Sequence, residues 1–279
     1  MSNDYARCAQ LIRQADGLLI TAGAGIGVDS GMPDFRGPHG FWGAYPALGR
    51  ARLAFEQIAN PAAFASQPRL AWGFYGHRLQ LYRRTQPHQG FEILRRIGEQ
   101  MPHGAFVFTS NVDGQFQKAA FAAERISECH GSIHYLQCSD GCDAYEGCDA
   151  DRDGIWPADD FDPEVDEEQC LLRSDLPLCP HCQQIARPNI LMFGDWRWRS
   201  ERSDAQDDRR RTWLRQVTNL LTIEVGAGTD IPTARLLGER VKGPLIRINP
   251  GAPQLPPGKG VSIAAGGLVA LRAIAAALD

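Results

Sequence analysis

Short apolar runs alternate with amphipathic segments along much of the chain. The runs are mostly apolar and only five or six residues long, which is typical of strands buried on both faces of a sheet. They are residues 17–22, 105–109 and 220–225. Helical spacing of apolar side chains marks residues 5–15, about 90–100 and 233–241. Strands that alternate with helices predict a parallel, doubly wound α/β sheet.

Two segments do not fit this alternation. Residues 40–84 are rich in aromatic side chains and helical in pattern, and residues 135–186 carry most of the cysteines. Both interrupt the alternation of strands and helices, so they predict additions to the main sheet. The sequence contains no internal repeat and no low-complexity linker.

The composition is that of a globular protein. Of the 279 residues, 43% are hydrophobic, and no apolar run approaches the roughly 20 residues that cross a bilayer. The first residues lack the charged and then apolar pattern of a signal peptide, so we expect a cytoplasmic protein that does not enter a membrane. In such a protein, eight cysteines that include close pairs indicate metal ligands in place of disulfides.

The net charge of −4 hides an uneven distribution. Residues 143–175 carry 13 of the 33 acidic side chains, whereas the rest of the chain has 27 basic and 20 acidic ones. Such a block indicates a solvated surface, and a docking face for a basic partner is the alternative. No basic stripe interleaved with aromatic residues is present, so we expect no nucleic-acid partner.

A glycine-rich run, residues 23–37, follows the first predicted strand directly. Glycines at this point allow backbone N–H groups to approach a pyrophosphate, which predicts a nucleotide site. The dehydrogenase fingerprint is incomplete, because Val28 occupies the place of its third glycine and no acidic residue lies in 35–55. An ordinary hydride-transfer domain is therefore disfavoured.

This run resembles the signature of the sirtuin family, a Gly-Ala-Gly-Ile turn followed by small residues and Pro-Asp-Phe-Arg. Further matches follow in family order over nearly the whole chain. They are residues 109–114, 128–132, two cysteine pairs, 187–195, 225–229 and 246–249.

The resemblance implies a two-lobed molecule with the active cleft between the lobes. The Rossmann-like NAD-binding domain would comprise residues 1–39, 85–134 and 187–279. The smaller lobe would comprise a helical insertion, 40–84, and a zinc-binding module, 135–186. The implied activity is NAD-dependent protein lysine deacylation, with the acylated lysine of a protein as substrate. The sequence does not indicate the oligomeric state.

The resemblance also assigns roles at the site. His130 matches the general base, and an imidazole suits proton transfer near neutral pH. Asn111 and Asp113 match contacts to the nicotinamide ribose and nicotinamide; a turn or cap role is the alternative for Asp113 and Asp34. The implied cofactor contacts are Ala22, Gly23, Ala24, Gly25, Ile26, Asp34, Phe35, Arg36, Ser110, Asn111, Val112, Asp113, His130, Gly226, Gly228, Thr229, Asn249 and Ala264.

Two distant cysteine pairs predict a structural zinc site. Cys179 and Cys182 have the two-residue gap of a zinc knuckle, and Cys138 and Cys142 form a looser pair 36 residues earlier. Cys148 or Cys170 remains an alternative to one of these ligands. A site made only of thiolates is closed and structural, so zinc is expected to hold the module together.

Tyr75 and Arg78 match a Tyr-x-x-Arg pair of sirtuins that act on acidic acyl groups. On a helix, residues three apart share a face, so a phenol and a guanidinium there predict recognition of a substrate carboxylate. A surface tyrosine with an arginine lying along it is the alternative. The family also implies that the acylated segment adds as a strand beside Phe193, Gly194 and the loop 226–230.

Three departures from the family pattern leave other activities open. Gly27 replaces a serine, Ser110 a glutamine, and Gln115 with Phe116 a Leu-His pair. Each change removes or replaces a polar neighbour of the cofactor. NAD hydrolysis or ADP-ribosyl transfer is therefore one alternative to deacylation, and an NAD- or ADP-ribose-binding sensor with weak catalysis is another.

Overall fold

A six-stranded parallel sheet forms the larger part of the molecule. The computed structural model of the chain describes residues 3–33, 42–43, 45–140 and 154–278. The sheet has the strand order β11-β10-β9-β1-β2-β3. Its strands are β1 (Gly17–Ala22), β2 (Ala105–Thr109), β3 (Ile126–Glu128), β9 (Leu220–Val225), β10 (Leu245–Ile248) and β11 (Gly260–Ile263). This order confirms the predicted doubly wound α/β fold and places a topological switch point between β1 and β9.

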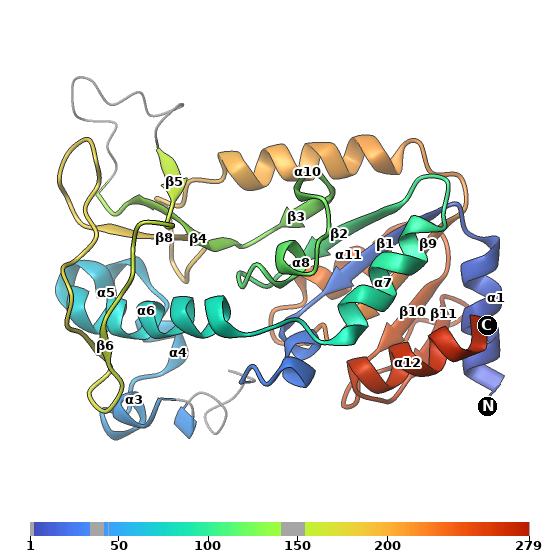
Figure 1. The fold of residues 1–279 in the computed structure, drawn as a ribbon, viewed down its shortest axis with the longest axis horizontal. Coiled ribbons are helices and arrows are strands. Elements are labelled where there is room, and N and C mark those ends of the chain that lie inside the picture. Colours follow the sequence, from blue (N-terminus) through green and yellow to red (C-terminus); the bar gives the residue numbers. More distant parts are fainter. Residues whose placement is uncertain (1–2, 34–41, 44, 141–153, 279) are drawn as a thin grey trace.

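Helices cover both faces of this sheet (Figure 1). One face packs against α1 (Asn3–Gln14), α7 (Gln89–Glu99) and α12 (Gly267–Leu278), and the other against α10 (Glu201–Leu214) and α11 (Thr233–Arg240). The strand side chains alternate between two cores: Leu18 and Ile20 of β1 join the first, and Leu19 joins the second. Burial on both faces explains why these strands are continuous apolar runs in the sequence.

A second lobe contains the two segments that interrupt the alternation, and it has its own aromatic core. Its helices are α3 (Pro46–Arg50), α4 (Phe55–Ile58), α5 (Pro61–Ser66) and α6 (Pro68–Arg84). Its strands are β4 (Gly131–Cys138), β5 (Ile155–Pro157) and β8 (Ala186–Ile190), which form one antiparallel sheet, and the hairpin β6 (Val165–Asp166) and β7 (Leu171–Leu172). Figure 1 shows this lobe at the end of the molecule away from both termini.

Three short elements complete the described fold. They are the 3₁₀ helices η1 (Ala24–Ser30) and η2 (Ala123–Arg125) and the helix α8 (Gln115–Lys118). The strands predicted at 17–22, 105–109 and 220–225 have those bounds in the structure, and the predicted helices begin or end within two residues of α1, α7 and α11.

A buried ion network ties α11 to the sheet. Arg247 of β10 donates to both carboxylate oxygens of Glu224, its neighbour on β9, at 2.5 and 3.0 Å, and to Glu239 of α11 at 2.7 Å. The Arg247 and Glu224 side chains are fully buried. Each charge is therefore stabilised almost entirely by its partners and not by water.

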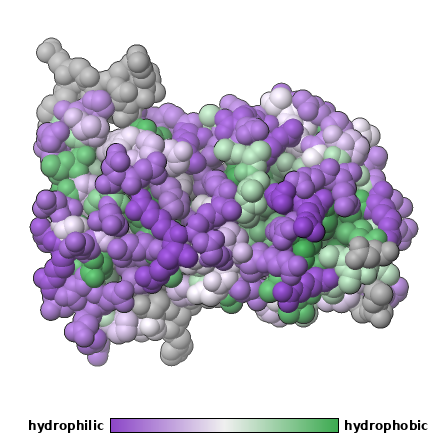
Figure 2. All heavy atoms as spheres, in the orientation of Figure 1, coloured by the Kyte–Doolittle hydropathy of each residue, from purple (hydrophilic) through white to green (hydrophobic). Residues whose placement is uncertain are grey.

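The face of the molecule drawn in Figure 2 is mostly polar. Hydrophilic residues dominate the face seen in Figure 2, and hydrophobic residues appear there in small separate groups. Within the described ranges, no helix combines the length and apolar character needed to span a membrane.

Loss of one partner of the network should destabilise the fold more than loss of both. Arg247→Met leaves the buried Glu224 carboxylate without its main counter-charge, so we expect about 3–5 kcal/mol lower free energy of unfolding in urea. The double variant Glu224→Leu with Arg247→Met removes both charges and should recover most of this loss. A single variant that loses less than about 1 kcal/mol would contradict the charge argument.

Candidate active site

The predicted phosphate-binding turn lies at the switch point of the sheet. η1 follows β1, and its backbone touches the loop after β9: a Cβ added to Gly25 would lie 2.7 Å from the Cα of Gly226. Gly226 has φ +62°, a left-handed conformation that favours glycine. Open α/β sheets bind ligands in the crevice outside the carboxyl ends of their strands, at such a switch point.

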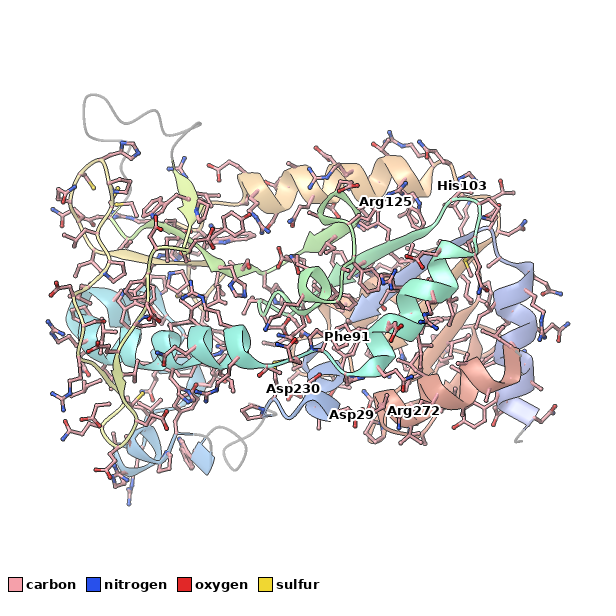
Figure 3. The ribbon with its side chains drawn as sticks, viewed as in Figure 1. Asp29, Phe91, His103, Arg125, Asp230 and Arg272 are labelled. Carbon is pink, nitrogen blue, oxygen red and sulfur yellow. The ribbon has the colours of Figure 1, made fainter. Side chains whose placement is uncertain are left out.

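Contacts from two helices hold this turn in place. The ring of His88, before α7, contacts the carbonyl oxygen of Ile26 at 2.8 Å and accepts a hydrogen bond from Gly90 at 2.9 Å. Asp29 accepts a hydrogen bond from the backbone N–H of Leu268 in α12 at 2.8 Å. Figure 3 shows Asp29 beside the helix that carries Arg272. The sequence motifs assign His88 no role, because its contact to residue 26 is not local.

Asn111 and Asp113 follow β2 and lie at the same edge of the sheet. The Asn111 amide donates to the carbonyl of Gly23 at 3.2 Å, and the side chain is 8% exposed. The Asp113 carboxylate accepts from the backbone N–H of Gln115 at 3.0 Å, as in an Asx turn. Burial raises the pKa of Asp113 to about 6, against the lowering effect of that hydrogen bond. Asp113 thus makes a local turn contact and is nearly buried.

His130 lies between β3 and β4, where the two lobes meet. Its Nε2 atom is 3.4 Å from the hydroxyl oxygen of Thr233, the first residue of α11. Burial lowers the pKa of His130, and a hydrogen bond with the backbone of Ser110 opposes that shift. The imidazole is therefore neutral at pH 7, as a proton acceptor must be.

Helix α10 clamps the residues just before His130. Arg202 donates to the buried carboxylate of Glu128 at 2.5 Å, and the backbone N–H of Glu128 donates to the side chain of Gln206 at 2.9 Å. The Ser203 hydroxyl donates to the carbonyl oxygen of Glu128 at 2.9 Å. The Arg202 guanidinium also lies 4.0 Å from the ring centroid of Tyr135. The sequence does not reveal this clamp, because α10 has a charged composition that resembles a solvated helix.

The loop after β8 carries Phe193 and Gly194. The backbone N–H of Phe193 donates to the carbonyl oxygen of Ala59 at 3.0 Å. At the start of the loop, the backbone N–H of Leu191 donates to the carbonyl oxygen of His130 at 3.0 Å. The loop is thus fixed beside the predicted base.

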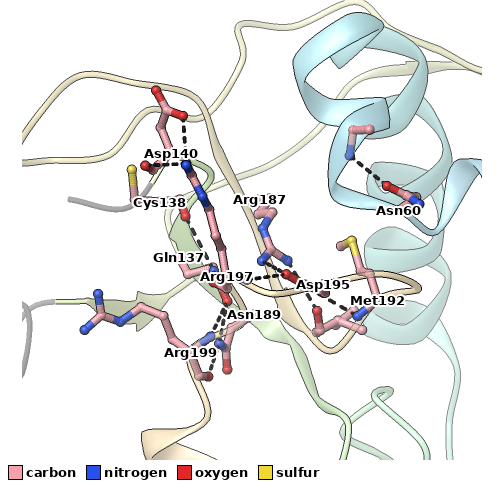
Figure 4. Close-up of polar contacts among 12 residues, drawn as sticks. Asn60, Gln137, Cys138, Asp140, Arg187, Asn189, Met192, Asp195, Arg197 and Arg199 are labelled. Atoms are coloured by element: carbon pink, nitrogen blue, oxygen red, sulfur yellow. Dashed lines mark hydrogen bonds and ion pairs between the residues drawn. The ribbon is translucent and has the colours of Figure 1, made fainter. Parts of the chain in front are cut away.

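Buried polar groups anchor this loop to the small antiparallel sheet. Asp195 forms a fully buried ion pair with Arg187 of β8 at 2.8 Å. Asn189 of β8 donates to the side chain of Gln137 on β4 at 3.0 Å. Figure 4 shows these contacts between the loop and the sheet. The loop therefore has little freedom to change its path.

Tyr75 and Arg78 lie inside the small lobe and not on its surface. They are 1% and 8% exposed, so the alternative of a surface pair is wrong. Burial raises the pKa of Tyr75 to about 12. The Arg78 guanidinium lies 5.2–5.8 Å from the ring centroids of Phe74, Tyr82 and Tyr75, and it donates to the Tyr82 hydroxyl at 2.7 and 3.0 Å. It also lowers the pKa of Asp113, against the larger effect of burial, so it lies within electrostatic reach of the cleft.

Three of the predicted zinc ligands converge. The sulfur atoms of Cys138, Cys179 and Cys182 lie within 4.8 Å of one another, which suits a tetrahedral ion with one further ligand. Cys142 and the alternative Cys148 lie outside the described residues. The alternative Cys170 is wrong: it lies apart from this cluster, in the aromatic core, where its backbone touches Gly73 of α6.

The remaining predicted cofactor residues differ in their surroundings. The Asn249 side chain is occupied by backbone groups: it donates to Ala227 at 2.9 Å and accepts from Gly251 and Ala252 at 3.0 and 2.9 Å. Ala22, Ile26 and Val112 are buried, Ala24, Thr229 and Ala264 are exposed, and Gly23, Ser110 and Gly228 line the same edge of the sheet as the ends of β1, β2 and β9. Asp34, Phe35 and Arg36 lie outside the described residues.

Comparison with known proteins identifies related sequences. A model of the Sir2 family matches residues 23–210. NAD-dependent protein deacylases of Aquifex aeolicus and Pyrococcus furiosus are 31% and 30% identical over 179 and 187 residues, which are 64% and 67% of this chain and 62% and 64% of theirs. The mitochondrial deacylase sirtuin-5 of Danio rerio is 28% identical over 203 residues, 70% of this chain and 62% of its own. The chain therefore spans less than two thirds of these relatives.

Solved structures share the fold. A Sir2 homologue crystallised with NAD superposes with a TM-score of 0.69 at 22% identity, covering 96% of this chain and 92% of its own. A Sir2 structure described as a basis for mechanism and regulation gives 0.68 at 20% identity, covering 100% and 98%. At this identity the likeness establishes the architecture alone.

The cysteine cluster predicts one zinc ion per chain. Cys179→Ser should lower both the zinc content and the melting temperature, because zinc-finger peptides gain about 10–16 kcal/mol from the ion. Cys170→Ala, outside the cluster, is the matched control and should retain full zinc in elemental analysis. Much less than one zinc per chain in active, unchelated wild-type protein would rule the site out.

Proposed function

Because the chain belongs to the Sir2 family, we propose that it is an NAD-dependent protein lysine deacylase that releases nicotinamide and O-acyl-ADP-ribose. The observation that carries this proposal is the meeting of the glycine turn, Asn111 and a neutral, half-buried His130 at one edge of the sheet. The names of the relatives support the same activity.

In this proposal NAD lies across the switch point. The backbone at Gly23, Gly25 and Gly226 would face its pyrophosphate, and the other predicted contacts would surround it from the ends of β1, β2 and β9. Asn111 and Asp113 would face the nicotinamide ribose. The Asn111 amide retains an oxygen for this contact, because its hydrogen bond to Gly23 uses only the nitrogen.

In the proposed reaction, a bond from C1′ of the ribose to the acyl-lysine oxygen replaces the bond from C1′ to nicotinamide. The acyl-lysine oxygen attacks C1′ as the bond to nicotinamide breaks, and His130 accepts a proton from a ribose hydroxyl. That hydroxyl would then attack the acyl carbon. A water molecule would add to the same carbon as the lysine amine leaves with a proton, and the original acyl oxygen would stay on C1′ as its hydroxyl. Burial of Asn111 and Asp113 keeps competing water away from the cationic C1′.

We propose that the acylated segment of the substrate binds between the lobes as an added strand. The loop of Phe193 and Gly194 would flank one side and the loop 226–230 the other. The buried ion pair of Asp195 with Arg187 supports this role, because it holds the first loop rigid.

Zinc would hold the small lobe together through Cys138, Cys179 and Cys182, with Cys142 as the fourth ligand. A thiolate site without an open position supplies no catalytic water, so its role is structural. Thiol ligands in place of disulfides favour a reducing compartment, and we therefore propose a cytoplasmic location. The lobe would comprise residues 40–84 and 135–186, the ranges predicted from the sequence.

We further propose that Arg78 favours acidic acyl groups. Its guanidinium keeps its charge although nine-tenths buried, and the rings of Phe74, Tyr75 and Tyr82 surround it. A succinyl, malonyl or glutaryl carboxylate would form a charge-assisted hydrogen bond there. The likeness to sirtuin-5 is consistent with this preference.

The departures from the family pattern support an alternative to deacylation. Gln115 is buried and donates to the carbonyl of Tyr82 at 3.2 Å, and Phe116 packs on Phe91, so neither supplies the polar group that the family has near the cofactor. NAD hydrolysis or ADP-ribosyl transfer is the second candidate function, and its products distinguish it from deacylation.

Removal of the base should abolish most of the deacylation. His130→Ala should lose about 10²-fold or more of turnover while the fold and NAD binding survive. His103→Ala, at the far end of the sheet (Figure 3), is the matched control. Because burial lowers the pKa of His130, the wild-type rate should stay level at neutral pH and fall only below about 6.5, the ordinary histidine value.

Mass spectrometry of the wild-type products checks the reaction itself. Deacylation gives O-acyl-ADP-ribose, hydrolysis gives ADP-ribose alone, and transfer adds ADP-ribose to an acceptor. Wild-type turnover in a folded His130→Ala protein would remove His130 from the mechanism.

Loss of Arg78 should act selectively on acidic substrates. Arg78→Met should lower kcat/KM for a succinyl peptide roughly 10- to 150-fold, the value of one charge-assisted hydrogen bond, and leave an acetyl peptide nearly unaffected. Arg83→Met is the control. Arg83 lies on the same helix as Arg78, but it donates to the backbone carbonyl oxygens of Phe161 and Ala158. A parallel fall for both peptides would assign Arg78 to the fold or the cofactor.

A further inference from the structure

One hydrogen bond to His130 comes from a helix that the sirtuin-like motifs do not include. Thr233 begins α11, and its hydroxyl oxygen lies 3.4 Å from His130 Nε2. Catalytic hydrogen bonds are often long in a ligand-free site and shorten when substrate binds. The ring also makes a hydrogen bond with the backbone of Ser110. Because Nε2 faces Thr233, we assign the Ser110 contact to Nδ1.

These two contacts define the proton positions on the ring. The Ser110 contact raises the pKa of His130, as a carbonyl oxygen does when it accepts a proton from the ring. The neutral ring then carries its proton on Nδ1 and a lone pair on Nε2. Only a donor satisfies that lone pair, so the Thr233 hydroxyl donates to it.

We infer that Thr233 is a positioning residue for His130. Its hydroxyl holds the imidazole with Nε2 directed into the cleft and yields that place to the ribose hydroxyl when NAD binds. The inference rests on the proposed function only for the identity of the incoming hydroxyl. The orientation of the ring is a property of the ligand-free protein.

The position of Thr233 is fixed by the rest of α11. Glu239, near the end of the helix, bonds Arg247, which pairs with Glu224 in the middle of the sheet. Arg235, two residues after Thr233, donates to the carbonyl oxygens of Ala252 and Gln254 at 2.9 and 3.0 Å. These contacts hold α11 in place, so the Thr233 hydroxyl has a fixed position beside His130.

The surroundings of His130 give this hydroxyl a measurable effect. Burial is the main influence on the pKa of the ring, followed by Ser110, and no charged side chain of the described residues adds a resolved effect. A hydroxyl accepts from the imidazolium as well as donating to the neutral ring, and hydrogen bonds to charged groups are the stronger ones. Loss of the hydroxyl should therefore lower the pKa of His130 further.

The test combines ring NMR with kinetics on the full chain. Thr233→Val removes the hydroxyl and keeps the shape, Thr233→Ser restores it, and Thr218→Val, just before β9 at the opposite end of the strands, is the control. With ¹⁵N-labelled histidine and no ligand, Thr233→Val should lower the pKa of His130 and mix its tautomers. Thr233→Ser and Thr218→Val should match wild type.

The kinetic arm measures nicotinamide release over a range of pH. Thr233→Val should lower kcat/KM about 2- to 10-fold, the value of one neutral hydrogen bond, with rescue by Thr233→Ser. Unchanged ring signals and an unchanged pH profile in folded Thr233→Val would overturn the inference. Altered ring signals in a protein without deacylase turnover would support the inference and count against the proposed function instead.

Discussion

The close contact between the loops after β1 and β9 is the constraint on which the site depends. A side chain at Gly25 or Gly226 would collide with the backbone of the other loop, so both positions need glycine. The contact holds the turn against the loop after β9, with the backbone N–H of Gly25 donating to the carbonyl oxygen of Gly226 at 3.1 Å, at the switch point of the sheet. Asn111 then bridges to Gly23 and links the end of β2 to the same point.

Polar side chains from distant segments hold the loops around this contact. α10 clamps Glu128 before His130, the Arg187 pair fixes the loop after β8, and the Arg247 network braces α11. Each clamp is partly or fully buried, where an unmatched charge is costly. These contacts hold the described loops around His130 and after β8 in place in the ligand-free protein, as a preorganised site requires.

The sequence predicted three of the six strands of the main sheet, and the contacts of the site less well. Buried parallel strands are continuous apolar runs, so β1, β2 and β9 could be placed to the residue. The contacts of Thr233, His88 and the α10 side chains join residues 62 to 103 positions apart, and no local pattern encodes them. Helical spacing brought Tyr75 and Arg78 together but did not reveal their burial. That burial depends on how α6 packs against the hairpin β6–β7, which spacing within one helix does not encode.

Burial also explains the charge state of the site. It raises the pKa of Asp113 to about 6 and lowers that of His130, so one physical cause moves an acid and a base in opposite directions. At pH 7 the carboxylate is still mostly ionised and the imidazole is neutral. The site therefore presents one negative charge and one proton acceptor, which matches the positive charge that develops at C1′ in the proposed reaction and the proton that must then be removed.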